Sequence, residues 1–350
     1  MTSNQPRRQP GKARRIRLAD VAERAGVSAM LVSLVMRGRP GASPANRERV
    51  LQVARELGYV PDARARVLRQ ERTNLLGVTF NLQQPFHADL VEGIYSAADA
   101  AGYEVVLSAV TDTRREDRAI ETLLAERCEA LILLGPQTPK SQLVDLAARL
   151  PVLVVARSVA DPSIDVVRTA DARGIQLAVD HLAGLGHTHI AHVDGGDAPG
   201  AAQRRKGYRD AMRRHGLADF VQVVRGGLKD DDGARAARQL LGSPDPPTGI
   251  LAFNDRCATG VLDALYRSRL VVPDDLSVVG FDDTHVAAFS HVDLTTVRQD
   301  AAVMARLAVE QAVGRLDEDD PREGNHQTVV APTLVVRGTT GPPPLPNSQR

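Results

Sequence analysis

Residues 18–38 read LADVAERAGVSAMLVSLVMRG, and this stretch decides the fold of the N-terminal part of the chain. Apolar side chains recur at helical spacing in two runs on either side of Gly26: Val21, Ala22 and Ala25, then Val27, Leu31, Val32 and Val35. Ser28 stands where its hydroxyl would cap the second helix. Two short helices joined by a glycine-containing turn describe a helix-turn-helix, in which small Ala22 permits a close crossing and Val32 fills the angle.

A third helix follows the pair. Ser43 precedes Pro44 and is expected to cap this helix, and Gly58 is expected to end it. Five apolar residues are expected to pack against the first two helices: Val50, Leu51, Val53, Ala54 and Leu57. The alternative is an ordinary helical hairpin inside a larger core, which the local positive charge and the small or polar outward face of the second helix disfavour.

The charge of the chain is divided unevenly along its 350 residues. The formal net charge is +1, yet residues 1–72 hold 16 Lys and Arg against six Asp and Glu, a net of +10. The other 278 residues carry 28 basic against 37 acidic side chains, a net of −9. A basic module suits a polyanion, because each cation that neutralises a phosphate releases counterions.

Composition excludes several classes of protein. With 43% hydrophobic and 25% charged residues, the chain matches an ordinary soluble globular protein. There is no apolar run of about 18 residues, and the basic N-terminus lacks the apolar stretch of a secretory signal, so we expect a cytoplasmic, nucleoid-associated protein with no membrane partner. Cys128 and Cys257 are far apart, which argues against a disulfide framework and a zinc site.

The segment after Gly58 is short and rich in arginine. It reads YVPDARARVLRQERTN. A lone helix of about eight residues within this stretch would be marginal in water, because nucleation is costly. One interpretation is a solvated linker. The other is a hinge helix that folds on DNA, with Leu68 wedged into the minor groove and three arginines on phosphates: Arg64, Arg66 and Arg69.

Beyond residue 74, apolar runs alternate with amphipathic helical stretches. Strands are predicted at 75–80, 103–110, 130–135, 151–156, 189–195, 221–226, 249–255 and 276–283. Continuous apolar strands between helices predict parallel sheets covered on both faces, and eight such units predict two doubly wound α/β subdomains. Ligands of such folds bind at the carboxyl ends of strands, in a cleft between subdomains.

The runs LADVAERAGVS, ERVLQVARELGYVPDARARVLR, LSVVGFDD and LTTVRQ resemble the lactose-repressor (LacI/GalR) family of bacterial transcription regulators, over about residues 16–340. The resemblance implies a helix-turn-helix headpiece and a core shaped like a periplasmic sugar-binding protein. The expected organisation is a disordered basic tail (1–15), headpiece (16–60), hinge (61–73), core (74–340) and disordered tail (341–350). The core would comprise one subdomain of about 74–168 plus 296–325 and another of about 169–295 plus 326–340.

The resemblance also implies function. The expected protein is a homodimer that binds a pseudo-palindromic double-stranded DNA operator as a repressor, under the control of a small carbohydrate effector. The candidate DNA-binding residues of the headpiece are Ser28, Ala29, Met30, Ser33, Leu34 and Arg37. Leu34 stands where relatives commonly have a base-reading arginine, so the operator sequence does not carry over from them.

Six residues are candidates for effector binding: Phe86, Arg157, Arg204, Asn254, Asp282 and Gln299. Asp255 and Asp283 are expected instead to cap a helix and a turn. A sugar is the first expectation, and Arg157 or Arg204 leaves open an acidic or phosphorylated sugar or a nucleoside.

Catalysis is not indicated. The chain has no GxGxxG, no GxxxxGK[ST] and no GxSxG, and the histidines of LGHTHIAH lack ligands at metal spacing. No cofactor, metal or enzymatic activity is expected. The second hypothesis for function is a ligand-binding or transport-associated protein that shares the core fold; the missing export signal and the fused headpiece disfavour it.

Overall fold

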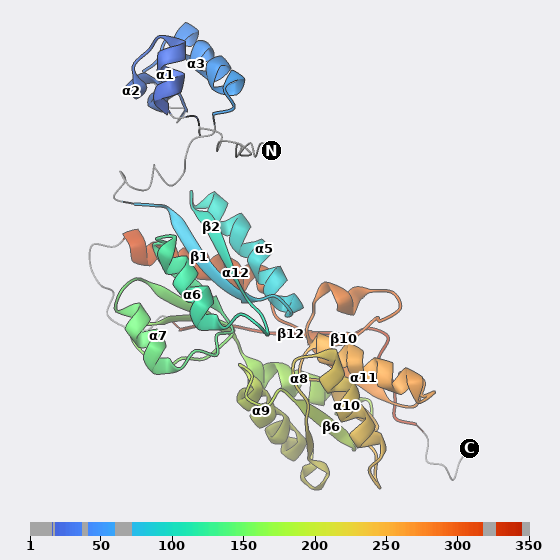
Figure 1. Ribbon diagram of the computed structural model, residues 1–350. Coiled ribbons are helices and arrows are strands. Elements are labelled where there is room, and N and C mark those ends of the chain that lie inside the picture. The colour runs from blue at the N-terminus through green and yellow to red at the C-terminus, as the bar shows by residue number, and fades with distance from the viewer. Residues whose placement is uncertain (1–15, 17, 37–40, 60–71, 318–326, 345–350) are drawn as a thin grey trace, which may run out of the picture. The chain divides into compact units, whose positions relative to one another are not determined.

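A computed structural model describes residue 16 and residues 18–36, 41–59, 72–317 and 327–344 (Figure 1). The chain forms two compact units, Met1–Arg72 and Thr73–Arg350, which are described separately below as the headpiece and the core. Several predictions fall outside the described residues: the basic tail, the whole of the proposed hinge up to residue 71, and the DNA-binding candidates Arg37, Arg64, Arg66, Leu68 and Arg69.

The headpiece is helical, as predicted. Its helices are α1 (Leu18–Ala25), α2 (Ala29–Met36) and α3 (Pro44–Glu56). Gly26 adopts φ +65°, a left-handed conformation that glycine takes at little cost, and this allows the sharp turn between α1 and α2. The Ser28 hydroxyl accepts a hydrogen bond from the Leu31 amide (3.2 Å), and that of Ser43 accepts one from the Asn46 amide (3.3 Å). Both predicted helix caps are confirmed.

Small apolar side chains fill the headpiece core. Its buried residues are Val21, Ala22, Ala25, Val32, Val35, Val50, Val53 and Ala54. One predicted member was wrong, because Leu51 is 39% exposed. Positions 50, 53, 54 and 57 repeat at the spacing of one helical face, whereas position 51 points about 100° away from it.

The core contains two six-stranded sheets. The first has the order β11-β5-β4-β3-β1-β2, and every pairing in it is parallel. Its strands are β1 (Leu75–Asn81), β2 (Glu104–Val110), β3 (Ala130–Leu134), β4 (Val152–Val155), β5 (Asp165–Thr169) and β11 (Gln327–Val330).

The second sheet has the order β12-β10-β9-β8-β6-β7, parallel except for the β10–β12 pair. Its strands are β6 (Ile190–Asp194), β7 (Gln222–Arg225), β8 (Gly249–Leu251), β9 (Ser277–Asp282), β10 (Thr295–Arg298) and β12 (Thr333–Val335). All eight strands predicted from apolar runs are present, and the doubly wound α/β fold is confirmed.

Helices cover both faces of each sheet. The first sheet packs against α5 (Pro85–Ala100) and α12 (Ala301–Asp317) on one face, and its other face is covered by α6 (Glu116–Ala125) and α7 (Lys140–Ala147). The second packs against α8 (Asp171–Gly184) and α9 (Ala201–Arg214) on one face, and α10 (Asp230–Leu241) and α11 (Asp255–Arg267) on the other. The two short 3₁₀ turns are η1 (Ala218–Phe220) and η2 (His285–Ala288). Within the described residues no helix is both long and apolar enough to cross a membrane.

The subdomain boundaries differ from those expected. The chain leaves the first sheet after β5, returns to it between β10 and α12, and leaves it again between β11 and β12. Residues 296–298 therefore belong to the second sheet and residues 327–330 to the first, the reverse of the expected division. Both strands are short, and β11 alternates exposed and half-buried residues at a sheet edge, so neither produced the apolar run that marks a central strand.

The C-terminal tail also begins later than expected. The Gly341 amide donates to the Ser277 hydroxyl (3.1 Å), and its carbonyl accepts from His187 Nε2 (2.9 Å). These bonds tie residue 341 to the second sheet, so the prediction that the disordered tail starts there was wrong.

Candidate functional site

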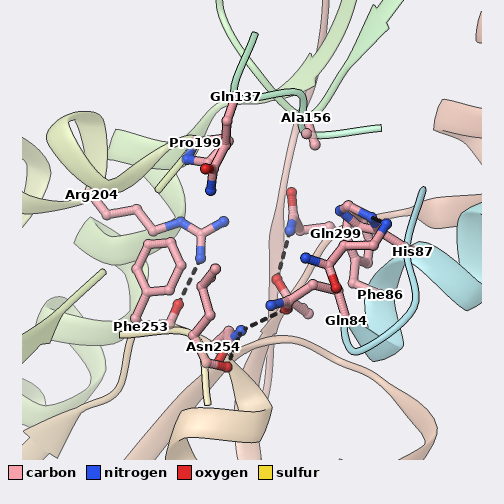
Figure 2. A pocket seen from close by; sticks show the side chains of 14 residues that line it. Gln84, Phe86, His87, Gln137, Ala156, Pro199, Arg204, Phe253, Asn254 and Gln299 are labelled. Atoms are coloured by element: carbon pink, nitrogen blue, oxygen red, sulfur yellow. Dashed lines mark hydrogen bonds between the residues drawn. The ribbon is translucent and has the colours of Figure 1, made fainter. Parts of the chain in front are cut away.

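A pocket lies in the core where the carboxyl ends of strands from both sheets meet (Figure 2). It contains about 560 Å³ of empty space, part of it open to solvent. Asn81 ends β1, Asp282 ends β9, and Gln299 follows β10; Ala156 and Asn254 lie just beyond β4 and β8. Polar groups at strand ends are the usual ligand contacts of doubly wound sheets, because loops there leave the side chains accessible.

Five of the six effector candidates line this pocket: Phe86, Arg204, Asn254, Asp282 and Gln299. They come from α5, α9 and β9 and from the loops after β8 and β10, separated by up to 213 positions in the sequence. Each of the five is less than one-tenth exposed. The pocket is therefore built from buried side chains whose positions are fixed by packing.

Arg204 is held on all sides. Its Nε donates to Asp171 Oδ1 (2.9 Å) and its Nη1 to the Phe253 carbonyl (2.6 Å). Its Cζ lies 3.5 Å from the centre of the Phe281 ring and 4.6 Å from that of Phe253. The ion pair with Asp171 balances the guanidinium charge inside the protein, and the aromatic faces add favourable contact. Arg204 can thus present hydrogen-bond donors to a ligand without requiring an anion.

Asp282 and Gln299 form a hydrogen-bonded pair in the pocket wall. Gln299 Nε2 donates to Asp282 Oδ1 (2.7 Å). Burial raises the pKa of Asp282, and the positive charge of Arg204 opposes this rise. Asp282 also has φ +116°, a strained value for a residue with a side chain, and such strain is concentrated at ligand-binding sites.

Asn254 has a structural role beside its place in the pocket. Its Oδ1 accepts from the Cys257 amide (2.8 Å) and caps α11, while its Nδ2 donates to Gln84 Oε1 (3.3 Å). The prediction that Asp255 caps this helix was wrong by one residue. Asp255 is fully buried and accepts from the Thr284 amide (2.7 Å) and hydroxyl (3.0 Å).

Asp283 was expected to cap a turn, and this was also wrong. Its two carboxylate oxygens accept from Arg298 Nε (2.6 Å) and Arg337 Nη2 (2.7 Å). These ion pairs join three segments of the second sheet, and they place Asp283 in the scaffold behind the pocket.

Phe86 and His87 begin α5 and belong to the pocket wall (Figure 2). Phe86 also packs in the apolar core under the first sheet. His87 Nδ1 accepts a hydrogen bond from the Asn81 amide (3.0 Å), and burial lowers the pKa of His87 to about 4. The imidazole is therefore neutral near pH 7.

Arg157 does not line this pocket. It borders a second, neighbouring cavity, and its Nη1 donates to the carbonyls of Pro136 (2.8 Å) and Thr138 (2.7 Å). Ala156, with φ +61°, lines the first pocket in its place. The prediction for Arg157 missed the pocket by one residue, because the turn after β4 directs Ala156 to the first pocket and Arg157 to the second cavity.

Several lining residues were not predicted, among them Gln84, Gln137 and Phe253. Gln84 and Phe253 lie next to predicted positions, so their proximity to Phe86 and Asn254 was the only available signal. Gln137 follows β3 in a loop that carries no motif.

Three of the five candidate DNA-binding residues described in the headpiece are exposed. Ser28, Ala29 and Met30 are exposed at the start of α2, and Met30 is 80% exposed. Ser33 and Leu34 are half-buried on the same helix, and a Cβ atom at Gly41 would lie 3.3 Å from Leu34 Cδ1. The start of α2 is therefore available to a partner, whereas Leu34 is partly engaged within the headpiece.

A small helix-turn-helix unit joined to a two-sheet core with a polar pocket defines the class of ligand-responsive DNA-binding regulators. Residues 17–62 match the model for "Bacterial regulatory proteins, lacI family", and residues 179–340 match a periplasmic binding protein-like domain. The ribose operon repressor of Escherichia coli K12 is 33% identical over 329 residues, covering 92% of this chain and 99% of the repressor. The chain belongs to the lacI family.

Two solved structures extend this similarity. The Lac repressor dimer bound to operator and the anti-inducer ONPF is 30% identical, with a TM-score of 0.80 over 94% of this chain and 100% of that one. A LacI transcriptional regulator from a Rhodococcus species is 53% identical, with a TM-score of 0.74 over 77% of this chain and 98% of that one. Because the first match includes the headpiece, it favours a DNA-binding regulator over a transport-associated protein.

Proposed function

We propose that this protein is a transcriptional repressor that binds its operator as a homodimer and whose DNA affinity is set by a sugar or sugar derivative in the core pocket. The observation that carries the effector half of the proposal is the pocket lining. Amides from Gln84, Gln137, Asn254 and Gln299 surround the charge-balanced Arg204. Sugars present many hydroxyl groups and no charge, which matches such a set of donors and acceptors.

Phe86, Arg204, Asn254, Asp282 and Gln299 are the residues we assign to the effector. Phe86 and Phe253 supply apolar surface for the faces of a sugar ring, and the polar groups fix its hydroxyls. Because the lining residues come from both sheets, a ligand contacts both subdomains at once. Effector binding then favours one arrangement of the two subdomains and shifts the population that holds DNA.

The proposed DNA-binding residues of the headpiece are Ser28, Ala29, Met30, Ser33 and Leu34, together with Arg37 outside the described residues. Helix α2 would lie in the major groove. The proposed headpiece boundaries, 16–60, agree closely with the family match to residues 17–62. The Lac repressor, as a dimer on its operator, supports a homodimer here. For the hinge (61–73) we propose the phosphate and wedge roles of Arg64, Arg66, Leu68 and Arg69.

We infer that the protein acts in the cytoplasm, at the nucleoid, because its proposed operator is chromosomal. We also infer that it has no enzymatic activity, in keeping with relatives that are DNA-binding regulators.

The test is operator binding with and without sugars. Fluorescence anisotropy would measure binding of the full-length protein to DNA from beside its own gene and to random DNA, at several salt concentrations. A preference of about a thousandfold or more for one fragment is expected, with a change in affinity when a cognate sugar is added. Equal affinity for all fragments at low salt contradicts the proposal.

The Leu68→Ala substitution tests the hinge. Loss of an apolar wedge should weaken specific binding more than non-specific binding, because only the specific complex contains kinked DNA. Equal losses on operator and random DNA would reject the wedge role and leave operator binding itself intact.

A further inference from the structure

A second cavity adjoins the effector pocket and differs from it in charge. It contains about 1080 Å³ of empty space, part of it open to solvent. Gln137, Pro199 and Leu228 line both spaces, so the two spaces adjoin at these three residues. The second cavity is bordered by three cations: Arg157, Arg225 and Lys229.

Two of these cations have no ion-pair partner among the residues that the structure describes. Within the described part of the chain, no carboxylate lies within 4.0 Å of Arg157 or Arg225, although arginines elsewhere in the core pair with acids, as Arg204 does with Asp171. Lys229 pairs with Asp112 (2.8 Å), and Asp232 on the cavity wall pairs with Arg235. Asp197 is the remaining acid, and it is exposed. Arg225 is exposed like Asp197, and among the described residues the two unpaired arginines against Asp197 leave a net charge of +1 around the cavity.

Arg157 is held in a fixed orientation. Its Nη1 donates to both the Pro136 and Thr138 carbonyls, and this fixes the plane of the half-buried guanidinium. The Nε and Nη2 groups form the edge that binds carboxylate or phosphate oxygens in pairs, and no protein group described here accepts from them. A pre-oriented guanidinium loses little freedom when an anion binds.

Four glycines contribute to the lining of the cavity. The neighbouring parallel strands β6 and β7 pair Asp194 with Arg225, and each strand is followed by two glycines: Gly195-Gly196 and Gly226-Gly227. At Gly196 a Cβ atom would have no neighbour within 4 Å, so open space reaches the backbone there. A ligand group can therefore approach the backbone closely at Gly196, whereas side chains of Phe253, Val193 and Asp232 fill the space beside Gly195, Gly226 and Gly227.

We propose that the second cavity binds an anionic group, a phosphate monoester or a carboxylate, carried by the sugar that occupies the first pocket. This inference rests on the proposed effector function and narrows it to acidic sugar derivatives. The first pocket holds the neutral ring because its one arginine is already paired, and the second holds the anion at Arg157 and Arg225.

The test compares sugars with their acidic derivatives on the full-length protein by isothermal titration calorimetry. Ribose, galactose and glucose would be titrated beside ribose 5-phosphate, galactose 6-phosphate and glucose 6-phosphate, with glucuronate as the carboxylate and inorganic phosphate alone. At least one derivative is expected to bind about tenfold or more tightly than its parent sugar, an advantage that falls as salt rises.

Charge-neutral variants locate the effect. Arg157→Gln and Arg225→Gln should each reduce the affinity ratio between derivative and parent sugar, and the double variant should remove it. Arg209→Gln removes an equal charge from an exposed position on α9 and should leave the ratio unchanged. The Arg225 side chain makes no hydrogen bond with described residues, so its variant remains informative if Arg157→Gln disturbs the loop at 136–138.

The outcomes separate this inference from the proposed function. If parent sugars bind and alter operator affinity while no acidic derivative binds more tightly, the inference is wrong and the proposed function stands. If a disaccharide such as cellobiose binds more tightly than the monosaccharides while no acidic derivative binds more tightly than its parent sugar, the inference is likewise wrong and the proposed function stands. If no sugar or derivative binds, both are contradicted.

Discussion

The headpiece and the core hold their candidate binding residues in opposite ways. In the headpiece Ser28, Ala29 and Met30 are exposed, on a helix whose other side packs against small apolar residues. In the core, Arg204 and Gln299 are only 5% exposed, and hydrogen bonds within the protein fix them. The two units also carry opposite net charge, +10 before residue 73 and −9 after it.

This difference has consequences for substitution. An exposed residue at the start of α2 can be replaced, and its DNA contact altered, with little effect on the fold, because its side chain makes few contacts within the headpiece. A pocket residue in the core also supports the structure, so its replacement alters stability and ligand binding together. The predictions below test whether the two units respond separately in this way.

The largest effect is expected for Arg204→Met. It leaves Asp171 buried without its cation, which costs about 3–5 kcal/mol of stability in the core, and it removes effector binding. Urea unfolding followed by circular dichroism measures the first, and calorimetry with sugars the second. Arg209→Met, on the exposed side of the same helix, is the matched control.

Adding Asp171→Asn to Arg204→Met should recover part of the lost stability, because it removes the unpaired charge. If the double variant is no more stable than Arg204→Met, the ion pair does not account for the loss.

Val32→Asn tests the headpiece in the same manner. Val32 is fully buried between the helices, and an amide without partners there costs about 3 kcal/mol. Because so small a unit has little stability to lose, operator binding should fall about a hundredfold or more while sugar binding by the core is retained. Leu51→Asn makes a similar change on the exposed face of α3 and should have little effect. Loss of sugar binding in Val32→Asn would show that the units are not independent.

The core should lose stability from His87 as pH falls. The folded protein lowers the pKa of His87 from 6.5 to about 4, so only the unfolded chain takes up this proton near pH 5. Above pH 6.5 the ring is neutral in both states and His87 costs no stability. As pH falls from 6.5 toward 4, the unfolded state is protonated first, so the free energy of unfolding decreases, by about 2 kcal/mol between pH 7 and pH 5.

Urea unfolding of wild type and His87→Asn at both pH values isolates this contribution, since Asp282 and other groups titrate in both proteins. The difference between pH 7 and pH 5 should shift by about 2 kcal/mol in the variant. The exposed His291→Asn serves as control, and identical pH profiles for wild type and His87→Asn would contradict the prediction.

The smallest effect is expected for Ser43→Ala. The Ser43 hydroxyl caps α3, and its removal should cost about 1 kcal/mol in the headpiece and nothing in the core. Amide hydrogen exchange of the headpiece residues measures this change in the free energy of unfolding. A variant as stable as wild type would mean that water replaces the cap.

Sequence patterns predicted most of the fold because they report local physics. Helix caps at Ser28 and Ser43 and the apolar face of α1 depend on residues within one or two turns. Each of the eight predicted strands contains an apolar run, and all but β2 and β7 are central in their sheets. Prediction failed at β10 and β11, whose sheet membership depends on where the chain crosses between the sheets. It also failed for Arg157 and Asp255, where a shift of one residue at a turn changes what a side chain contacts.

The sequence by itself determined that a basic helix-turn-helix precedes an acidic α/β core, because charge and hydrophobic periodicity are carried by neighbouring residues. Only the tertiary structure decided which polar side chains share a pocket. It brings Phe86, Arg204 and Gln299 together, pairs Arg204 with Asp171, and leaves Arg157 and Arg225 around a separate cavity. The physical reason is that charge balance and burial depend on atoms from distant segments, and spacing along the chain does not specify those distances.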